Sequence, residues 1–174
     1  MLTISVWPRR LKEFLLTHPL YKSPPHEIWY NTDVKKEAYP SGAMLYDIPY
    51  FADERGAMNV LEIFRELPFA CQRIFYTYTV PEGSVRGEHA HKACEQFLIS
   101  VRGQVSVTVD NGRVRDEFML DTPSKGLWLP AGCWGEQFGH SPDSILLVLA
   151  SLPYDNADYI RSYDEFLAWK KGVR

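Results

Sequence analysis

Long apolar runs, paired cysteines and an excess of positive charge are all missing from this 174-residue chain. No apolar stretch approaches the roughly 20 residues that a membrane-spanning helix needs. The start, MLTISVWPRRLKEFLL, lacks the charged, apolar and small-residue segments of a signal peptide in their usual order. Three cysteines, an odd number with no CxxC motif, fit a reduced compartment best. We therefore expect a cytoplasmic protein without a membrane partner.

The lack of positive charge also limits the classes of ligand that the protein can bind. A net charge of −3 argues against nucleic acid, because proteins that bind it present clustered lysine and arginine to the phosphates. A nucleotide is still compatible with this charge, because one or two well-placed arginines are enough to bind its phosphates. The length fits one domain with a short appendage, and a hydrophobic fraction of 45% is ordinary for a globular core.

The first 32 residues are predicted to be an extension, so that residues 33–174 make up the main domain. Residues 8–17 carry an apolar stripe at helical spacing, with Pro8 in the first turn and Pro19 just beyond the end. This pattern predicts a short helix. We expect the extension to pack on the main domain or on a partner subunit.

From residue 43 onward the chain breaks into short apolar segments separated by turn residues, a texture typical of β-sandwiches and barrels. Near the end, Ser162 and Glu165 have the spacing of a capping box and predict a C-terminal helix. The Asn111-Gly112 pair predicts a hairpin. Strands are predicted over residues 43–48, 57–64, 72–80, the histidine segment described next, and 96–102, 104–110, 113–120, 126–130, 135–138 and 145–151.

The segment GSVRGEHAHKACEQFLISVRG, residues 83–103, has the most unusual pattern. His89 and His91 are two residues apart, so in a strand both imidazoles point to the same face. The surrounding polar residues are dense for a core strand. We interpret this segment as a strand that lines a pocket.

Two imidazoles in one pocket suit proton transfer, because imidazole takes up and releases a proton near neutral pH. The natural substrate is a carbon acid next to a carbonyl, which forms an enediolate that a nearby arginine or tyrosine can stabilise. We expect His89, His91 and Tyr76 to be catalytic. The substrate-binding candidates are Arg73, Arg86, Tyr78, Gln96 and Glu95.

The spacing of Gly83, His89 and His91 resembles the first motif of the cupin barrels, and GLWLPAG at residues 126–132 resembles the second. The resemblance implies an all-β double-stranded β-helix, a jelly-roll barrel, with a pocket between its two sheets. Most cupins bind a metal through two His, one Glu and a further His.

Two of those four ligands are missing here. Gln96 stands at the carboxylate position and Gly135 at the position of the second-motif His. Strict alternation turns Glu95 to the other face, unless a bulge intervenes. Two histidines and a neutral amide bind a divalent ion poorly. We therefore expect no metal and no cofactor.

Two longer strings, RGEHAHK at residues 86–92 and YDNADYIRSYDEF at residues 154–166, resemble the nucleotide-sugar 3,4-ketoisomerases. These are small cupins that act on dTDP-4-keto-6-deoxyglucose, and the resemblance covers residues 43–167. It implies metal-independent conversion of a 4-keto to a 3-keto sugar through an enediol, catalysed by His89 and His91. It also implies a homodimer that can exchange N-terminal strands, and a role in deoxyamino-sugar synthesis for a surface glycan such as the O-antigen of lipopolysaccharide.

Three other functions stay open. A nucleotide-sugar epimerase uses a similar barrel, but usually shows one His supported by an Asp. A non-catalytic cupin that binds a sugar nucleotide is compatible with Gly135, and a metal-dependent oxygenase is the third alternative. Trp128 and Trp134 either stack on a thymine ring or fill the mouth of the barrel.

Overall fold

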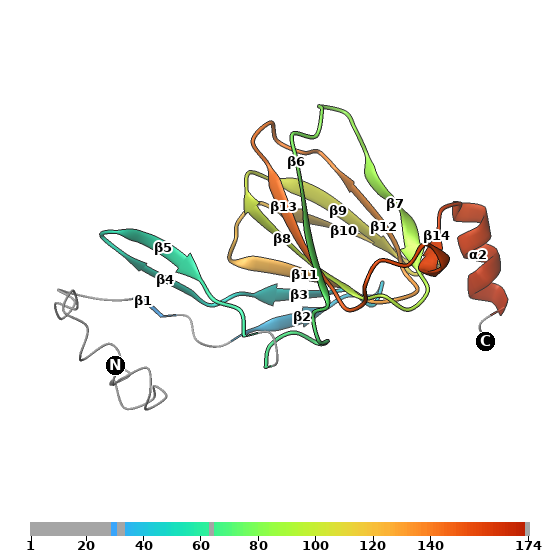
Figure 1. Cartoon of the computed structure of the whole chain (residues 1–174), viewed down its shortest axis with the longest axis horizontal. Helices are drawn as coiled ribbons and strands as arrows, with labels where there is room; N and C mark the ends of the chain where they lie inside the picture. Colours follow the sequence, from blue (N-terminus) through green and yellow to red (C-terminus); the bar gives the residue numbers. More distant parts are fainter. Residues whose placement is uncertain (1–28, 31–33, 63–64, 173–174) are drawn as a thin grey trace.

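The computed structural model describes residues 29–30, 34–62 and 65–172, and in this part of the chain the fold is two facing antiparallel sheets (Figure 1). The predicted helix over residues 8–17 and most of the predicted extension lie outside the described residues. The jelly-roll arrangement predicted from the cupin motifs is confirmed. No helix in the described ranges is long and apolar enough to cross a membrane.

The larger sheet has six strands in the order β2-β3-β11-β8-β13-β6. All of its pairings are antiparallel. The strands are β2 (Lys36–Ala38), β3 (Met44–Asp47), β11 (Lys125–Leu129), β8 (Gln96–Arg102), β13 (Ile145–Ala150) and β6 (Arg73–Tyr78).

The smaller sheet has five strands in the order β10-β9-β12-β7-β14. They are β10 (Arg115–Leu120), β9 (Val105–Asp110), β12 (Trp134–Phe138), β7 (Arg86–His91) and β14 (Tyr159–Ile160). The predicted hairpin joins β9 to β10, with Gly112 at a φ of +85° in the turn. The predicted strands of the barrel agree with the structure to within two residues at each end, whereas β2 and β14 were not predicted.

The core lies between the two sheets and follows from alternation along the strands. Val105, Val107 and Val109 of β9 are fully buried in it. They meet Leu98 of β8 and Leu146 of β13 from the other sheet. Because side chains in a strand alternate between its two faces, each of these strands contributes every second residue to this core.

A small three-stranded sheet projects from the barrel as an arm (Figure 1). It consists of β1 (Trp29–Tyr30), β4 (Tyr50–Asp53) and β5 (Gly56–Asn59), with β4 in the centre. A turn between Asp53 and Gly56 joins β4 to β5. Of the predicted strand over residues 57–64, residues 57–59 belong to β5, residues 60–62 are not strand, and residues 63–64 lie outside the described residues.

The C-terminal helix α2 (Tyr163–Gly172) begins where the capping pattern predicted. The Ser162 hydroxyl accepts a hydrogen bond from Glu165 N–H at 3.4 Å. Phe166 is fully buried against Trp134, so α2 covers part of the five-stranded sheet. Trp134 therefore packs under the helix, and Trp128 donates a hydrogen bond to Glu95, which favours packing over base stacking for both indoles.

Candidate active site

The site is built on β7, whose path is set by a β-bulge. Its pairing with β12 places His89 opposite Gly135 and Gly87 opposite Glu136, so Glu88 is the additional residue. Gly87 has a φ of +83°, and a Cβ added to it would lie 2.7 Å from the carbonyl oxygen of Gly135. Only glycine fits there without displacing backbone. The bulge resets the alternation just before the histidines.

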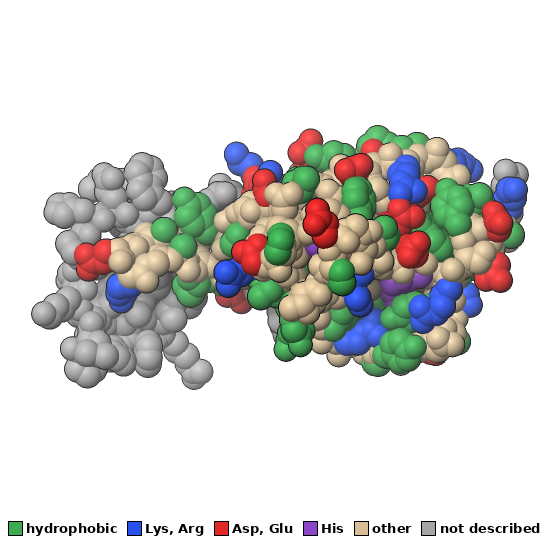
Figure 2. Space-filling view, turned by 90° about the horizontal axis from the view of Figure 1, so that it is seen from above, with side chains coloured by type: hydrophobic (Ala, Val, Ile, Leu, Met, Phe, Trp, Pro, Cys, Tyr) green, Lys and Arg blue, Asp and Glu red, His purple; other side chains and the backbone are tan. Residues whose placement is uncertain are grey.

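His89 and His91 project together, as their spacing predicts. Their ring centroids are 4.9 Å apart with the planes nearly perpendicular, at 85°. Tyr159 on β14 pairs with His91, and its ring lies 4.3 Å from His91 and 4.9 Å from His89. From above the molecule, histidine side chains show at the surface among lysine and arginine side chains (Figure 2). His89 is partly exposed, so a ligand can reach it, whereas His91 is buried beneath the surface.

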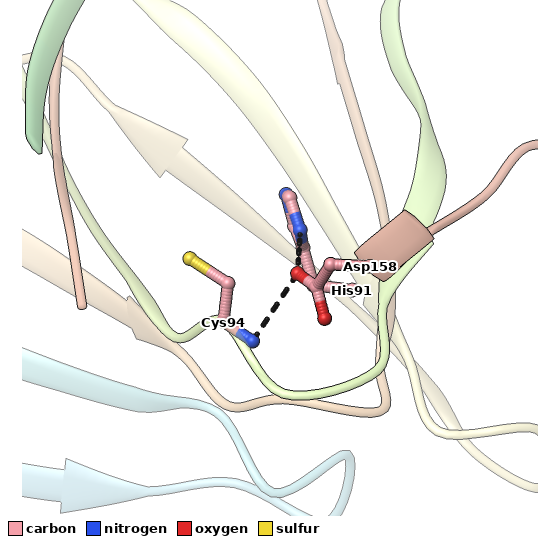
Figure 3. Close-up of side chains that lie close together, drawn as sticks. All are labelled: His91, Cys94 and Asp158. Carbon is pink, nitrogen blue, oxygen red and sulfur yellow. Dashed lines mark hydrogen bonds and ion pairs between the residues drawn. The ribbon is translucent and has the colours of Figure 1, made fainter. Parts of the chain in front are cut away.

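His91 is supported by Asp158, a residue that the sequence analysis missed. Its Nδ1 lies 2.7 Å from Asp158 Oδ2 (Figure 3). The carboxylate also accepts hydrogen bonds from the backbone N–H groups of Ala93, at 2.7 Å, and Cys94, at 3.3 Å. Burial pushes the pKa of Asp158 upward, but the hydrogen bonds from His91 and the two backbone groups outweigh it and hold the pKa below its usual range.

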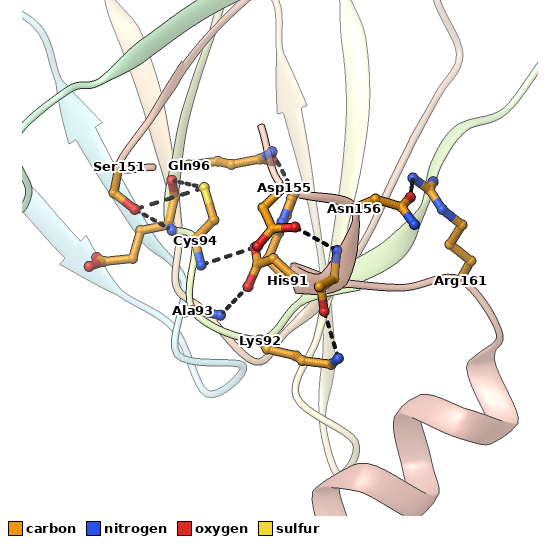
Figure 4. Close-up of polar contacts among 12 residues, drawn as sticks. His91, Lys92, Ala93, Cys94, Gln96, Ser151, Asp155, Asn156 and Arg161 are labelled. Carbon is orange, nitrogen blue, oxygen red and sulfur yellow. Dashed lines mark hydrogen bonds and ion pairs between the residues drawn. The ribbon is translucent and has the colours of Figure 1, made fainter. Parts of the chain in front are cut away.

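Because an ionised carboxylate only accepts hydrogen bonds, His91 carries its proton on Nδ1. Its other ring nitrogen, Nε2, lies 3.1 Å from the amide nitrogen of Gln96 on β8 (Figure 4). Both side chains are buried, each about 4% exposed. Burial lowers the pKa of His91, the hydrogen bond to Asp158 opposes this, and the neighbouring His89 lowers it further.

His89 is held by its own strand. Its Nδ1 donates to the carbonyl of Gly87 at 2.7 Å, so the bulge also orients this ring. Burial lowers the pKa of His89, the Gly87 carbonyl opposes the change, and the positive charges of Arg161 and Arg73 lower it further. Both imidazoles are therefore neutral near pH 7 and able to accept a proton.

Two arginines supply the positive charge beside the histidines. Arg73, a predicted substrate-binding residue, lies on the inward face of β6, and its guanidinium is 5.8 Å from the Tyr154 ring. Arg161 lies 4.4 Å over the Tyr159 ring and was not singled out from the sequence. Arg161, Tyr159 and Asp158 all belong to the string at residues 154–166, which was noticed only as a resemblance. The order of charged and aromatic residues in that string was the available signal.

The other predicted substrate-binding residues are dispersed. Arg86 begins β7 opposite Gln137, and its positive charge, together with burial, lowers the pKa of His140. Glu95 points to the outer face of the six-stranded sheet and accepts from Trp128 Nε1 at 2.8 Å, as alternation predicts. Gln96 contacts His91 directly.

Tyr76 and Tyr78 do not join the site within one chain. They lie on the outward face of β6, exposed by 61% and 58%, whereas Arg73, Phe75 and Thr77 point inward. The expectation that these tyrosines act beside the histidines is therefore corrected for the single chain. The physical reason is the period of two along the strand, which turns Tyr76 away from the face that carries Arg73.

The described residues offer a poor set of metal ligands. At the usual cupin position, His89 and His91 are accompanied by the amide of Gln96 and by Gly135, which has no side chain. His91, Cys94 and Asp158 have potential ligand atoms within 4.8 Å of one another (Figure 3). There, however, Asp158 is already bound to His91 and to two backbone N–H groups, so an ion would have to displace these hydrogen bonds.

Comparison with known proteins agrees with this site. Residues 41–171 match the family FdtA, described as WxcM-like, C-terminal. A TDP-4-oxo-6-deoxy-alpha-D-glucose-3,4-oxoisomerase from Aneurinibacillus thermoaerophilus is 39% identical over 114 residues, which are 66% of this chain and 82% of that protein.

Two solved structures are similar over most of their length. A 3,4-ketoisomerase from Helicobacter canadensis has a TM-score of 0.72 and 36% identity, over 74% of this chain and 97% of that one. A histidine-to-asparagine mutant of the 3,4-ketoisomerase QdtA from Thermoanaerobacterium thermosaccharolyticum, in complex with TDP-4-keto-6-deoxyglucose, has a TM-score of 0.72 and 32% identity, over 75% and 95%. The chain therefore belongs to the FdtA family of cupin-fold proteins, and the relatives named here are a 3,4-oxoisomerase and two 3,4-ketoisomerases.

Proposed function

We propose that this protein is a metal-independent 3,4-ketoisomerase that converts TDP-linked 4-keto-6-deoxyglucose into its 3-keto isomer. The observation that carries the proposal is the pair of neutral imidazoles on one strand face, with Asp158 behind His91 and two arginines alongside. Two of the relatives named above are named for, or were solved with, this class of sugar nucleotide. The geometry supplies the acid, the base and the charge stabilisation that such a reaction needs.

The reaction moves one hydrogen from C3 to C4 of the sugar. When the sugar binds and takes the place of the Gln96 amide at His91 Nε2, this nitrogen takes the proton from C3, next to the C4 carbonyl, while Nδ1–H stays bonded to Asp158. The electron pair of the C3–H bond forms the enediolate, with negative charge on O4. The hydroxyl proton on O3 then moves to O4, directly or through solvent, so that the negative charge shifts to O3. C3 becomes the carbonyl as an imidazolium returns a proton to C4, which now carries the hydroxyl group. No electrons are gained or lost overall.

His89 is the second acid–base group of this mechanism. It lies next to His91, and its Nδ1 is bonded to Gly87, so Nε2 is the atom that faces the ligand. Protonation of one imidazole discourages protonation of its neighbour through charge repulsion. One proton is therefore shared by the pair, and either ring can return it to the sugar.

The arginines and inward polar atoms of β6 fit the charged end of the substrate. Arg73 Nε and Thr77 Oγ1 are buried and have no hydrogen-bond partner among the described residues. A buried polar atom without a partner costs about 1–3 kcal/mol, so these two atoms fit a site that a polar ligand completes. Arg73 and Arg161 then bind the diphosphate or the developing oxyanion. Tyr154 and Tyr159, 5.5 Å apart, form an aromatic surface beside them.

The absence of a carboxylate or imidazole at Gln96 and Gly135 supports metal independence, because the ligand set favours no divalent ion. All three cysteines are unpaired. This supports a reducing, cytoplasmic location.

A deuterium-exchange assay tests the function. Wild-type protein, His89→Asn and His91→Asn are each incubated in D₂O with TDP-4-keto-6-deoxyglucose and followed by NMR. Wild type should yield a 3-keto product with deuterium at C4, and His91→Asn should lose at least about 100-fold in rate, as expected for removal of a general base.

Other outcomes decide between the alternatives. Inversion at C3 or C5 with the 4-keto group retained would indicate the epimerase. Binding without exchange would indicate a non-catalytic sugar-nucleotide-binding protein. The His–Asp pairing that we regarded as typical of epimerases occurs here as His91–Asp158, so that feature does not separate the two enzymes.

We also propose that the protein is a homodimer that associates through the outer face of β6. Ile74, Tyr76 and Tyr78 are each about 60% exposed there and form one apolar strip. The strip lies on the edge strand of the six-stranded sheet, where a second copy can cover it.

Light scattering after size exclusion tests the assembly. Wild type should have twice the mass of the chain, and the double variant Tyr76→Glu, Tyr78→Glu should be a monomer with an unchanged circular dichroism spectrum. Val114→Glu, an exposed apolar residue on the β9–β10 turn, is the control and should stay dimeric. A monomeric wild type, or a dimeric double variant, would refute this interface.

A further inference from the structure

The proposed reaction includes one proton transfer between two oxygen atoms of the sugar. After the C3 proton has gone to His91, the hydroxyl proton on O3 has to reach O4. Direct transfer between neighbouring oxygens of one ring is strongly bent, and hydrogen bonds weaken steeply below about 120°. A third group that accepts from O3 and donates to O4 at the same time avoids this bend. A hydroxyl group has both capacities.

The polar groups already assigned to the site are unsuited to this transfer. Arginine side chains only donate, and the ionised carboxylate of Asp158 only accepts. The amide of Gln96 would have to become an imidic acid if its oxygen accepted a proton while its nitrogen gave one up. His89 would have to become a second imidazolium beside protonated His91, which charge repulsion disfavours.

Tyr159 brings a hydroxyl group to the histidines. It pairs with His91 across β14 and β7, so both side chains point to the same face of the sheet. Its ring centroid lies 4.3 Å from that of His91 and 4.9 Å from that of His89. The next residue, Ile160, is buried on the other face in a cluster with Trp134. A sugar that reaches the two imidazoles therefore also meets the face that carries Tyr159.

The hydroxyl group of Tyr159 is available to a ligand. Among the described residues it has no hydrogen-bond partner, and the side chain is only half-buried. Two other tyrosines of the same C-terminal string use their hydroxyl groups within the protein. Tyr154 donates to Asn156 at 3.5 Å, and Tyr163 donates to Asp110 at 2.8 Å.

Arg161 limits the movement of the Tyr159 ring. Its guanidinium lies 4.4 Å over the ring, where a cation is attracted to the aromatic face. The same guanidinium donates to Asn156 Oδ1 at 3.4 Å, which ties it to the loop before β14 (Figure 4). The ring is thus contacted by two imidazoles and a guanidinium before a ligand arrives.

We propose that Tyr159 is a catalytic residue that relays the hydroxyl proton from O3 to O4 of the sugar. Its oxygen Oη accepts the O3 proton while its own hydrogen passes to O4. The O3–H bond and the original Oη–H bond break, and a new Oη–H bond and an O4–H bond form. Tyrosine ends unchanged, and no electrons are gained or lost. The inference rests on the proposed function, because the relay acts on the enediolate of that reaction.

The first test separates the carbon step from the oxygen step. Wild type and Tyr159→Phe are incubated with TDP-4-keto-6-deoxyglucose in D₂O and followed by NMR. In Tyr159→Phe, formation of the 3-keto product should fall at least about 100-fold. Because His91 is intact, the C3 hydrogen of unreacted substrate should still be replaced by deuterium, within about tenfold of the wild-type turnover rate.

The control is Tyr163→Phe, which removes the hydroxyl group that bonds to Asp110 on α2 and should keep wild-type kinetics. Product formation at the wild-type rate in Tyr159→Phe would overturn the relay. A parallel loss of C3 exchange and product would also overturn it, because it would indicate a structural role for the ring. Wild type that neither exchanges nor isomerises would refute the proposed function itself.

Thr77 also brings an unpartnered hydroxyl group to the inward face of β6. It lies four residues along the strand from Arg73, which is roughly 13 Å at the usual rise per residue. We expect Thr77→Val to slow C3 exchange and product formation in parallel, through weaker binding. Product loss with retained exchange in Thr77→Val, and not in Tyr159→Phe, would assign the relay to Thr77 and overturn the inference.

The second test uses substrate that carries deuterium at C3. Cleavage of the C3–H bond precedes the relay, so a slow relay conceals it, and the C3 isotope effect on kcat in Tyr159→Phe should be close to unity. The ratio of kcat in H₂O to kcat in D₂O should rise above the wild-type ratio, because the relayed proton exchanges with solvent. A C3 isotope effect larger than that of wild type would show slower C–H cleavage and would contradict the relay.

Discussion

Single residues at this site act through the nitrogen atoms they bind. Asp158 and Gln96 each bind one nitrogen of the same imidazole, and Gly87 binds Nδ1 of the other. Each ring therefore has a defined tautomer and orientation before a ligand arrives. Two carboxylates lie near the histidines. Glu95, next to Gln96 in the sequence, points to the outer face of its sheet, whereas Asp158 bonds to Nδ1 of His91.

Asp158→Asn tests the residue scale. The amide can still hydrogen bond to His91 but carries no charge, so it no longer stabilises the imidazolium, and kcat should fall about 100-fold or more. Loss of the negative charge lowers the pKa of His91, so the acidic limb of kcat/KM should move to lower pH. Steady-state kinetics from pH 5 to 8 measure both effects. Asp164→Asn, on the exposed side of α2, should behave as wild type, and a fully active Asp158→Asn enzyme would contradict this role.

At the scale of elements, side-chain alternation explains which face of a strand most site residues occupy. The bulge in β7 explains the exception. β6 sends Arg73 inward and Tyr76 outward, and β8 sends Gln96 inward. β7 breaks the alternation at Glu88, where two residues oppose one on β12. The sequence shows the period of each strand, so these faces could be predicted. The residue of β12 that lies opposite the bulge depends on how the two strands pair, so it could not be predicted from the sequence.

Gly135 shows how an element limits substitution. It lies opposite His89 on β12, and a Cβ at this position would come within 3.0 Å of Leu129. The core leucine therefore occupies space that a side chain at residue 135 would need. The sequence shows that the second-motif His is missing. Only the packed barrel shows that Leu129 fills the space of that side chain.

On the scale of the whole molecule, three histidines make the stability of the fold depend on pH. His89, His91 and His140 all have pKa values lowered by burial, and His140 Nε2 has no partner among the described residues. Their pKa values in the folded protein lie below about 6.5, the value in an unfolded chain. Below that pH the unfolded chain binds more protons than the folded one, so stability is present above about pH 6.5 and is lost as the pH falls toward the folded values.

We therefore predict a steep loss of stability between pH 6.5 and 5. Each proton taken up on unfolding lowers the free energy of unfolding by about 1.4 kcal/mol per pH unit. Urea unfolding at half-unit steps of pH measures the slope. His140→Gln should make the slope shallower by about a third, because one of three groups is removed. A free energy of unfolding that does not change across this range would contradict the prediction.

What the sequence determined by itself was local. The strand periods, the common face of His89 and His91, the outward turn of Glu95 and the cap of α2 all follow from residues within a few positions of one another. Only the tertiary structure brought Asp158 to His91 across 67 residues and set Gln96 against Nε2. The physical reason is that side-chain alternation is encoded along one strand, whereas the pairing of β14 with β7 and the facing of two sheets depend on the burial of the whole core.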